Sequence, residues 1–398
     1  MRNTTVLVSG ASIAGPSLAY WLYRYGFAVT VVERAPALRP GGQAVDFKGS
    51  THRTVLTRMG ILDDVERRRT GTTDMVFVDE QGSRLAVLSG DFTGGDVEIL
   101  RGDLSEIIYR RTADRCEYLF GDSITALTET ATGVHVEFER APARTFDLVF
   151  GADGIHSRVR RLAFGPERDF VKHLGYYYAV AGASPWSGEA TGPRERAVAH
   201  AHNAPGRLAI SGGPKAQQMY MFASPVLDYA RDDSAAQRRI LARTYVGIGW
   251  EVPRMLADMT EFDDVYLDSL GQVRMADGYT KGRVALVGDS AYGNTLGGFG
   301  TGLAVVGAYV IAGELACADG DHTVAFARYD EIMKRYAKIA GNSNAGRFLA
   351  PKTARGIRMR NRFLGSRLFT LMMKYGDNAA NDIDLKDYPA LLGAAGAR

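Results

Sequence analysis

The first 33 residues constrain the fold most, because they contain a strand, a glycine turn, a helix and a second strand in succession. An apolar strand leads into the loop 10–15, and apolar residues then recur at helical spacing up to Tyr25. Gly10 provides the sharp turn after the strand, and Gly15 allows the helix to pack closely on it. A second apolar strand ends at Glu33. This succession predicts a βαβ unit.

The same segment carries most of a dinucleotide-binding motif. Such a motif directs the N-terminal amides of the helix at a pyrophosphate and places an acidic residue where it accepts hydrogen bonds from a ribose. Glu33 has that position, and its charge argues against a 2′-phosphate on the nucleotide. Ser12 replaces the middle glycine of the G-x-G-x-x-G pattern, and its small side chain can still admit and hydrogen-bond a phosphate. A βαβ unit without a nucleotide stays the alternative.

Two later segments repeat the combination of a strand and a glycine turn. The run 147–160 is an apolar strand that leads into Asp153 and Gly154 and then into the start of a helix. The run 282–302 is a strand that ends at Asp289, followed by a glycine-rich loop and an apolar helix. Aspartate at the carboxyl end of a strand can hydrogen-bond a polyol chain, and ligands of open α/β sheets lie at that edge. For the first of these segments, an ordinary strand-to-helix turn is the alternative.

Together, the three motifs resemble those of the group A flavoprotein monooxygenases, the family with the p-hydroxybenzoate hydroxylase fold. The resemblance extends over nearly the whole chain and is strongest to the tetracycline-inactivating and polyketide-tailoring members. A length of 398 residues is similar to that of members without an extra C-terminal domain. Further resemblance comes from the stretches 14–22, 41–46, 98–104 and 272–275.

This resemblance implies an α/β (α+β) fold, in which a Rossmann-like FAD-binding domain of the glutathione-reductase type is interrupted by a mixed β-sheet substrate domain. The sequence itself changes in texture after Arg161, where aromatic-rich strands begin, and returns to an α/β pattern near Val284. We expect a discontinuous FAD-binding domain over 1–73, 99–170 and 272–330. A substrate-binding sheet would follow over 74–98 and 171–271, and C-terminal helices over 331–398 would bridge the two.

The resemblance implies FAD as the bound cofactor and NADPH or NADH as a transient one. Carried over to this sequence, it assigns the adenosine half of FAD to the first motif, the ribityl chain to Asp289, and the isoalloxazine ring to the glycine loop before the last apolar helix. The Asp153–Gly154 pair belongs to a motif linked to both cofactors. The full set of expected cofactor residues is Gly10, Ser12, Ala14, Gly15, Glu33, Arg34, Gln43, Arg101, Asp153, Gly154, Asp289, Gly298, Gly300 and Gly302.

The glycine loop departs from the family pattern. Members of the family usually carry a proline between the Gly-Asp pair and the last glycines, and that proline segment lies beside the flavin. The stretch 292–302 contains no proline, and Asn294 and Thr295 occupy its neighbourhood. We therefore expect a more flexible loop with different flavin contacts.

Aromatic residues of the middle section are the candidates for substrate contact. Tyr178, Tyr220 and Phe222 lie on expected strands, and Phe299 lies in the glycine loop. As a set they suit a flat apolar or aromatic ligand, because cavities of this kind are mostly apolar. Only about half of the side chains of a strand point to one face. Membership of a plain hydrophobic core is therefore the alternative for each of them.

Charge and cysteine content bound the partners and the compartment. There are 48 Lys and Arg against 45 Asp and Glu, and the basic residues are scattered, so nucleic acid is not an expected partner. Two distant cysteines favour a reduced, cytoplasmic setting. The solidly apolar run 303–312 is too short to span a bilayer, so no membrane insertion is expected. We expect a monomer or weak dimer with no metal site.

The resemblance implies an FAD-dependent, NAD(P)H-consuming monooxygenase. It would hydroxylate an aromatic or polycyclic small molecule, of the polyketide or tetracycline kind, with O₂ as co-substrate and a flavin C4a-hydroperoxide as intermediate, in antibiotic tailoring or inactivation. No residue is marked as a catalytic base. A flavin oxidase or dehydrogenase is one alternative, and a non-catalytic flavoprotein that sequesters a metabolite is another.

Overall fold

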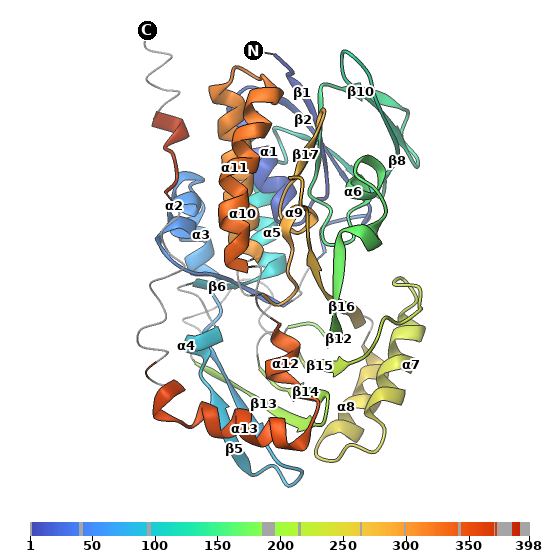
Figure 1. Cartoon of the computed structure of the whole chain (residues 1–398), viewed down its shortest axis with the longest axis vertical. Helices are drawn as coiled ribbons and strands as arrows, with labels where there is room; N and C mark the ends of the chain where they lie inside the picture. Colours follow the sequence, from blue (N-terminus) through green and yellow to red (C-terminus); the bar gives the residue numbers. More distant parts are fainter. Residues whose placement is uncertain are drawn as a thin grey trace.

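The computed structural model describes residues 2–39, 43–93, 97–184, 196–213, 216–262, 265–297, 300–340, 344–369, 371 and 384–390. Figure 1 shows two groups of elements. The upper group contains the N-terminal strands with the long helices α10 and α11, and the lower group contains β12 to β15 with α7, α8 and α13. The mixed α/β fold with C-terminal helices confirms the fold prediction.

The upper group is built on a six-stranded sheet in the order β17-β18-β11-β1-β2-β7. β1 is paired in parallel with β2 on one side and with β11 on the other, so the strand order reverses at β1. Ligands of such sheets bind at the carboxyl ends of the strands beside this reversal. The strands are β1 (Thr5–Ser9), β2 (Ala28–Glu33), β7 (Glu117–Phe120), β11 (Leu148–Gly151), β17 (Thr280–Lys281) and β18 (Val284–Leu286).

Helices complete the upper group, and α1 and α6 contact this sheet directly. Their bounds are α1 (Ala14–Arg24), α2 (Ser50–Arg58), α3 (Leu62–Arg67), α5 (Arg101–Arg110), α6 (Arg158–Ala163), α9 (Asp289–Tyr292), α10 (Gly300–Cys317) and α11 (His322–Ala340). Two small antiparallel sheets flank them, one of β3 (Ala44–Phe47) and β6 (Val97–Leu100), the other of β8 (Ile124–Glu129), β9 (Val134–Phe138) and β10 (Arg144–Phe146).

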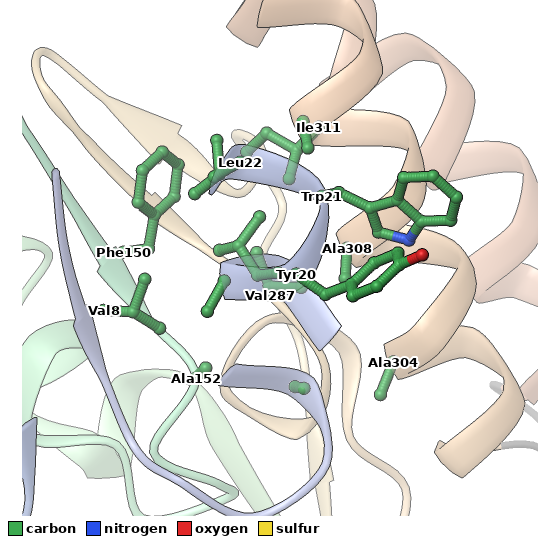
Figure 2. Close-up of a cluster of buried hydrophobic side chains, with 14 of the residues drawn as sticks. Val8, Tyr20, Trp21, Leu22, Phe150, Ala152, Val287, Ala304, Ala308 and Ile311 are labelled. Atoms are coloured by element: carbon green, nitrogen blue, oxygen red, sulfur yellow. The ribbon is translucent and has the colours of Figure 1, made fainter. Parts of the chain in front are cut away.

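The contact between α1 and α10 forms the centre of this core (Figure 2). Trp21 of α1 packs edge-on against Tyr309 of α10, with ring centroids 4.9 Å apart. By length and composition alone α10 could cross a membrane, but 78% of its apolar window is buried inside the protein. A helix that is apolar on all sides is expected when neighbours surround it.

The lower group is built on a seven-stranded sheet in the order β16-β12-β15-β14-β13-β4-β5. The helices α7 (Ser234–Tyr245) and α8 (Val252–Asp258) cover one face, and α12 (Ala345–Leu349) and α13 (Ala354–Leu364) cover the other. The short elements are α4 (Gly90–Thr93) and two 3₁₀ turns, Glu167–Asp169 and Met259–Glu261. The strands are β4 (Thr73–Val78), β5 (Arg84–Leu88), β12 (Val171–Ala181), β13 (Ala197–Ala204), β14 (Arg207–Ser211), β15 (Gln218–Ala223) and β16 (Val265–Val273).

The expected domain limits stay a prediction, but the strand pairings show which segments associate. Strands from 73–88 and 171–273 share the seven-stranded sheet. β6 pairs with β3 and packs in the upper core, although its first two residues lie within the expected substrate segment. α11 is a continuous helix through the expected limit at residue 330.

Candidate functional site

The three glycine motifs meet at the carboxyl ends of β1, β11 and β18. The Ala152 N–H donates to the Ser9 carbonyl over 2.8 Å, and the Val287 N–H donates to the Gly151 carbonyl over 2.8 Å. Gly10 has a φ of +107°, and a Cβ there would lie 2.4 Å from the Ala152 oxygen. The segments that the sequence analysis selected separately therefore form one edge.

Gly15 has the tightest surroundings in the first motif. A Cβ on this residue would lie 1.8 Å from the carbonyl oxygen of Gly10. The preceding residue, Ala14, packs against the third motif, since a Cβ at Gly288 would come within 2.9 Å of the Ala14 Cβ. The start of α1 can thus approach both neighbouring loops only because these positions carry no side chain or a methyl group.

Glu33 holds the first loop through its backbone. One carboxylate oxygen accepts the Ala11 N–H over 2.8 Å, and the other accepts the Ala35 N–H over 2.8 Å. Each carboxylate oxygen has a further lone pair, so both can accept another hydrogen bond. Arg34, the neighbouring expected residue, is exposed.

Ser12, which replaces the middle glycine, anchors an arginine. Its Oγ accepts hydrogen bonds from Nε and Nη2 of Arg101 over 3.1 and 2.9 Å. The Arg101 N–H donates to the Gln43 carbonyl over 3.1 Å. Ser105, one turn further along α5, donates through its hydroxyl to the Ser12 carbonyl over 2.9 Å. This contact brings a guanidinium to the mouth of the first glycine loop.

Asp289 begins α9, and the charge of the same guanidinium acts on it. Its side chain is accessible to solvent, yet the protein around it desolvates the carboxyl and raises its pKa, while the charge of Arg101 lowers it. A Cβ at Gly300 would lie 3.3 Å from Oδ1 of Asp289, so the first turn of α10 lies beside this carboxyl.

The Asp153–Gly154 pair precedes α6, whose N-cap residue is Ser157. Both oxygens of Asp153 accept hydrogen bonds, from the Ser157 hydroxyl and from the backbone N–H groups of Arg158 and Val159. Burial raises the pKa of Asp153, and these hydrogen bonds oppose the rise. Gly154 has a φ of +80°, which a side chain would disfavour. In this structure Asp153 binds the first turn of α6.

Two residues that sequence reasoning did not select connect the second and third motifs. Arg160 is fully buried and donates from Nη1 to the Ser290 carbonyl over 2.8 Å. Ser290 in turn donates to the carbonyls of Gly151 and Val287. Both lie inside the motifs 147–160 and 282–302, but only the fold shows that they bind each other.

Sequence reasoning also did not select His52 of α2. A Cβ on Gly302 would lie 2.3 Å from the His52 ring, so the imidazole packs directly on the first turn of α10. His52 is buried, and its Nδ1 accepts the Lys48 N–H over 3.1 Å. Nothing in the sequence around position 52 indicates this contact, because the two segments are 250 residues apart. The expected site residues Gly298 and Phe299 lie outside the described residues.

The loop without the proline is attached to β16. The Val273 N–H donates to the Gly293 carbonyl over 2.7 Å, and the Thr295 N–H donates to the Gly271 carbonyl over 3.0 Å. The Thr295 hydroxyl also accepts the Gly271 N–H over 3.2 Å. These bonds restrain residues 293–295, where the sequence analysis expected a more flexible loop.

Tyr178 is the expected substrate residue that the structure places near the cofactor residues. It is buried on the face of the seven-stranded sheet that α12 and α13 cover. Burial raises the pKa of its phenol most, the charge of Asp268 raises it further and the hydrogen bond with Tyr266 lowers it. Leu296 of the glycine loop packs on the same apolar cluster as Tyr178, so this face of the sheet lies next to the third motif.

Tyr220 and Phe222 point to the opposite face. In the register of β12 and β15, Tyr178 pairs with Met221, so the neighbours of Met221 point away from it. The Phe222 ring stacks on Tyr177 at 5.7 Å, and the Tyr220 ring meets Tyr245 of α7 at 5.0 Å. Both therefore lie in the core beneath α7 and α8, which was the alternative interpretation.

His156 joins the second motif to the seven-stranded sheet. Its Nε2 lies 3.0 Å from Oδ1 of Asp268 on β16, and its Nδ1 lies 3.0 Å from Oε1 of Glu167. Burial alone would lower the pKa of His156, but the hydrogen bonds to the two carboxylates raise it above its usual value. The pKa of Glu167 falls to about 2, because the imidazole outweighs its burial. The Tyr266 hydroxyl donates to Asp268 over 2.7 Å.

A separate cavity of about 300 Å³ lies where β14 and β15 meet α8. Its lining includes Ser211, Gln217, Arg254 and Asp258, and it contains none of the expected site residues. It opens on the α8 side of the seven-stranded sheet, whereas Tyr178 points to the other side. It is therefore distinct from the sheet edge that carries Asp289.

Comparison with known proteins agrees with this geometry. Residues 3–323 match the model of the FAD binding domain family. The chain is 42% identical over 340 residues to an uncharacterized protein of Mycobacterium tuberculosis, covering 82% of this chain and 88% of that protein. It is 38% identical over 348 residues to a flavin-dependent monooxygenase of Legionella longbeachae, covering 84% and 86%.

A similar solved structure is the tetracycline destructase Tet(51). It superposes with a TM-score of 0.78 at 31% sequence identity, covering 98% of this chain and 100% of that chain. The likeness therefore includes both sheets and the C-terminal helices.

Proposed function

Since the chain belongs to the FAD binding domain family of flavin-dependent monooxygenases, we propose that it hydroxylates an aromatic or polycyclic molecule of the tetracycline or polyketide kind. NADPH or NADH would supply the electrons and O₂ the oxygen atom. The observation that carries the proposal is the meeting of three glycine motifs, Arg101 and Asp289 at one sheet edge, next to a sheet face that holds Tyr178.

The residues at this edge suit FAD. Arg101 still has donors beyond the two that Ser12 receives, since a guanidinium carries five, and these can bind the pyrophosphate. Glu33 can accept hydrogen bonds from the adenosine ribose through its remaining lone pairs. The accessible carboxyl of Asp289 can accept them from the ribityl hydroxyls. The backbone amides at the start of α1 favour a negative charge there.

When bound, the flavin supplies the redox chemistry, accepting hydride and activating O₂. The chain binds and orients the reactants and excludes water. Tyr178 would contact the substrate, because its buried phenol faces the apolar side of the sheet and lies within range of Asp289 and Arg101. Leu296 of the glycine loop and Phe363 of α13 pack on the same apolar cluster, so they would shield it from solvent.

The substrate class rests on the similarity to the tetracycline destructase, together with the apolar cluster around Tyr178. Met221, Leu270 and Leu364 are buried in the same cluster as this tyrosine. Such a surface suits a flat, largely apolar ring system with few polar anchors.

A direct assay tests the proposal. Purified protein is mixed with FAD, NADPH and either tetracycline or an anthraquinone, and both NADPH and O₂ consumption are followed. We expect substrate-stimulated consumption of both, with a product heavier by one oxygen atom. Dehydrogenated product with stoichiometric hydrogen peroxide would instead support an oxidase. The loop without proline is the reason to consider this alternative. A protein that neither retains nor takes up FAD would contradict both enzymes and favour sequestration.

Replacing the ribityl-binding carboxylate should weaken FAD binding. Asp289→Ala removes an acceptor of charge-assisted hydrogen bonds, and we expect an about tenfold or larger increase in the FAD dissociation constant. Flavin fluorescence titration measures it. The matched control is Asp277→Ala, which removes an exposed aspartate and should leave the constant unchanged. Equal affinity in the two variants would show that Asp289 does not bind FAD.

A further inference from the structure

We propose that the outward side of the segment 352–371, which contains α13, docks on an anionic lipid surface. Docking here means peripheral binding, with the helix parallel to the membrane plane. The proposal does not depend on the reaction that the enzyme catalyses. It rests on the charge of the segment, the orientation of its side chains and the apolar residues among them.

The charge of the C-terminal region is one-sided. No Asp or Glu occurs from residue 332 to 376, whereas the chain as a whole has 48 basic and 45 acidic residues. Eleven basic residues occur in the same stretch, at 334, 335, 338, 347, 352, 355, 358, 360, 362, 367 and 374. A basic amphipathic helix of this composition is typical of proteins that bind membrane surfaces.

α13 separates these charges into two sides. Arg355, Arg358 and Arg362 recur at helical spacing and are exposed, so they share the outward side. Arg360 and Leu364 face the sheet and are buried. Within the described part of the chain, none of the three outward guanidinium groups has a hydrogen-bond or ion-pair partner. Their charges are available to an external anion.

Exposed apolar side chains occur in the same segment. Met359 is 61% exposed, Leu368 65% and Leu371 54%. Among the described residues, these three belong to a set of ten exposed large hydrophobic side chains, and they come from only 13 positions of the chain. Stable peripheral binding requires both a polybasic surface and apolar insertion, and the segment offers both.

The helix is held rigidly in this orientation. The Arg360 guanidinium lies 3.7 Å from the Phe77 ring centroid and donates from Nη2 to Oδ1 of Asn203. Its Nε donates to Oδ1 of Asn361 over 2.8 Å. Figure 1 shows α13 at the edge of the lower group, away from the N terminus. The basic side is therefore preformed and accessible, and it need not fold on contact.

Lipid explains the segment better than other anionic or apolar partners. A second copy would bring like charges together, which disfavours self-association through this side. A nucleic acid would neutralise the arginines but would leave Met359, Leu368 and Leu371 in water. An anionic bilayer can accept the arginines at its headgroups and the aliphatic side chains at the acyl boundary.

Docking would place the apolar cluster next to the membrane. Leu364 and Phe369 of the same segment pack into the cluster that contains Tyr178. A compound dissolved in the lipid would then reach that cluster without crossing bulk water.

Vesicle co-sedimentation of the full FAD-loaded protein tests the proposal. One set of vesicles contains phosphatidylglycerol and phosphatidylcholine, and the other contains phosphatidylcholine alone. We expect binding to the anionic vesicles that is at least about tenfold tighter, and that about 0.5 M NaCl weakens strongly. Equal binding to both sets, or no binding to either, would overturn the proposal.

Variants test which surface of the protein binds the vesicles. The triple variant R355E/R358E/R362E should lose binding to anionic vesicles. The control R239E/R243E/R254E makes the same charge change at exposed positions of α7 and α8 and should keep it. M359S/L368S should weaken binding at unchanged charge. Circular dichroism and flavin content confirm that each variant is folded. Equal losses in the two triple variants, or tighter binding to duplex DNA than to vesicles, would refute lipid docking.

Discussion

Site residues are positioned differently in two regions of the molecule. One region is the carboxyl edge of the six-stranded sheet, and the other is the seven-stranded sheet. At the edge, the determining atoms belong to the backbone, as where Gly10 approaches Ala152 and Gly15 approaches Gly10. On the seven-stranded sheet, the determining fact is the face to which a side chain points, as with Tyr178 and Phe222. The edge therefore tolerates almost no added atom, whereas the sheet tolerates changes that respect its faces.

The largest expected effect is at the edge. Gly15→Ala places a Cβ 1.8 Å from a backbone oxygen, and no side-chain movement can relieve that contact. We expect loss of FAD binding together with a large fall in thermal stability, measured by flavin content and calorimetry. Gly60→Ala is the control, because its φ is +68° but its Cβ would meet nothing within 4 Å. It should cost only about 1 kcal/mol. Gly15 itself lies in α1 and has no positive φ, so similar losses in both variants would mean that close approach does not control the edge.

A paired substitution on the seven-stranded sheet should have an intermediate effect. Phe222→Ala leaves a cavity beneath α7, and we expect it to lower the free energy of unfolding by about 3–5 kcal/mol with unchanged substrate KM. Tyr178→Phe keeps the ring and should cost little stability, while raising the substrate KM. Denaturant unfolding and steady-state kinetics measure the two quantities. If Phe222→Ala changed KM at unchanged stability, the two faces would have been assigned the wrong way round.

The smallest expected effect concerns the junction between the two regions. The folded-state pKa of His156 lies above its usual value because it binds Asp268 and Glu167. Its contribution to stability is therefore fully present below the unfolded pKa of about 6.5, and it is lost as pH rises through the folded value.

His156→Gln tests this linkage through the free energy of unfolding at several pH values. Its destabilisation relative to the wild type should be largest near about pH 5.5 and should shrink toward about pH 8.5. His135→Gln alters a histidine that contacts the neutral Thr145 hydroxyl, and it should show no such trend. A pH-independent loss at His156 would indicate packing in place of ionic binding.

Local patterns were enough to predict the cofactor edge in outline. The strands β1 and β2, the turn at Gly10 and the position of Glu33 follow from hydrophobic periodicity and from glycine conformation within about 30 residues. Asp289 could be selected because it follows an apolar strand directly. Arg160 and Ser290 were missed, although they lie in the same motifs, because each is defined by a partner on another segment.

By itself, the sequence determined the family, the mixed α/β fold and the three motifs that converge on one edge. Each motif depends on backbone conformations that consecutive residues determine, so it can be recognised without knowledge of the fold. Only the tertiary structure decided that Tyr178 lies on the face beneath α12 and α13 while Tyr220 and Phe222 lie on the opposite face. It also brought His156 to Asp268, 112 positions away, and Gly302 to His52. These outcomes depend on strand register and on packing between distant segments, which no local pattern specifies.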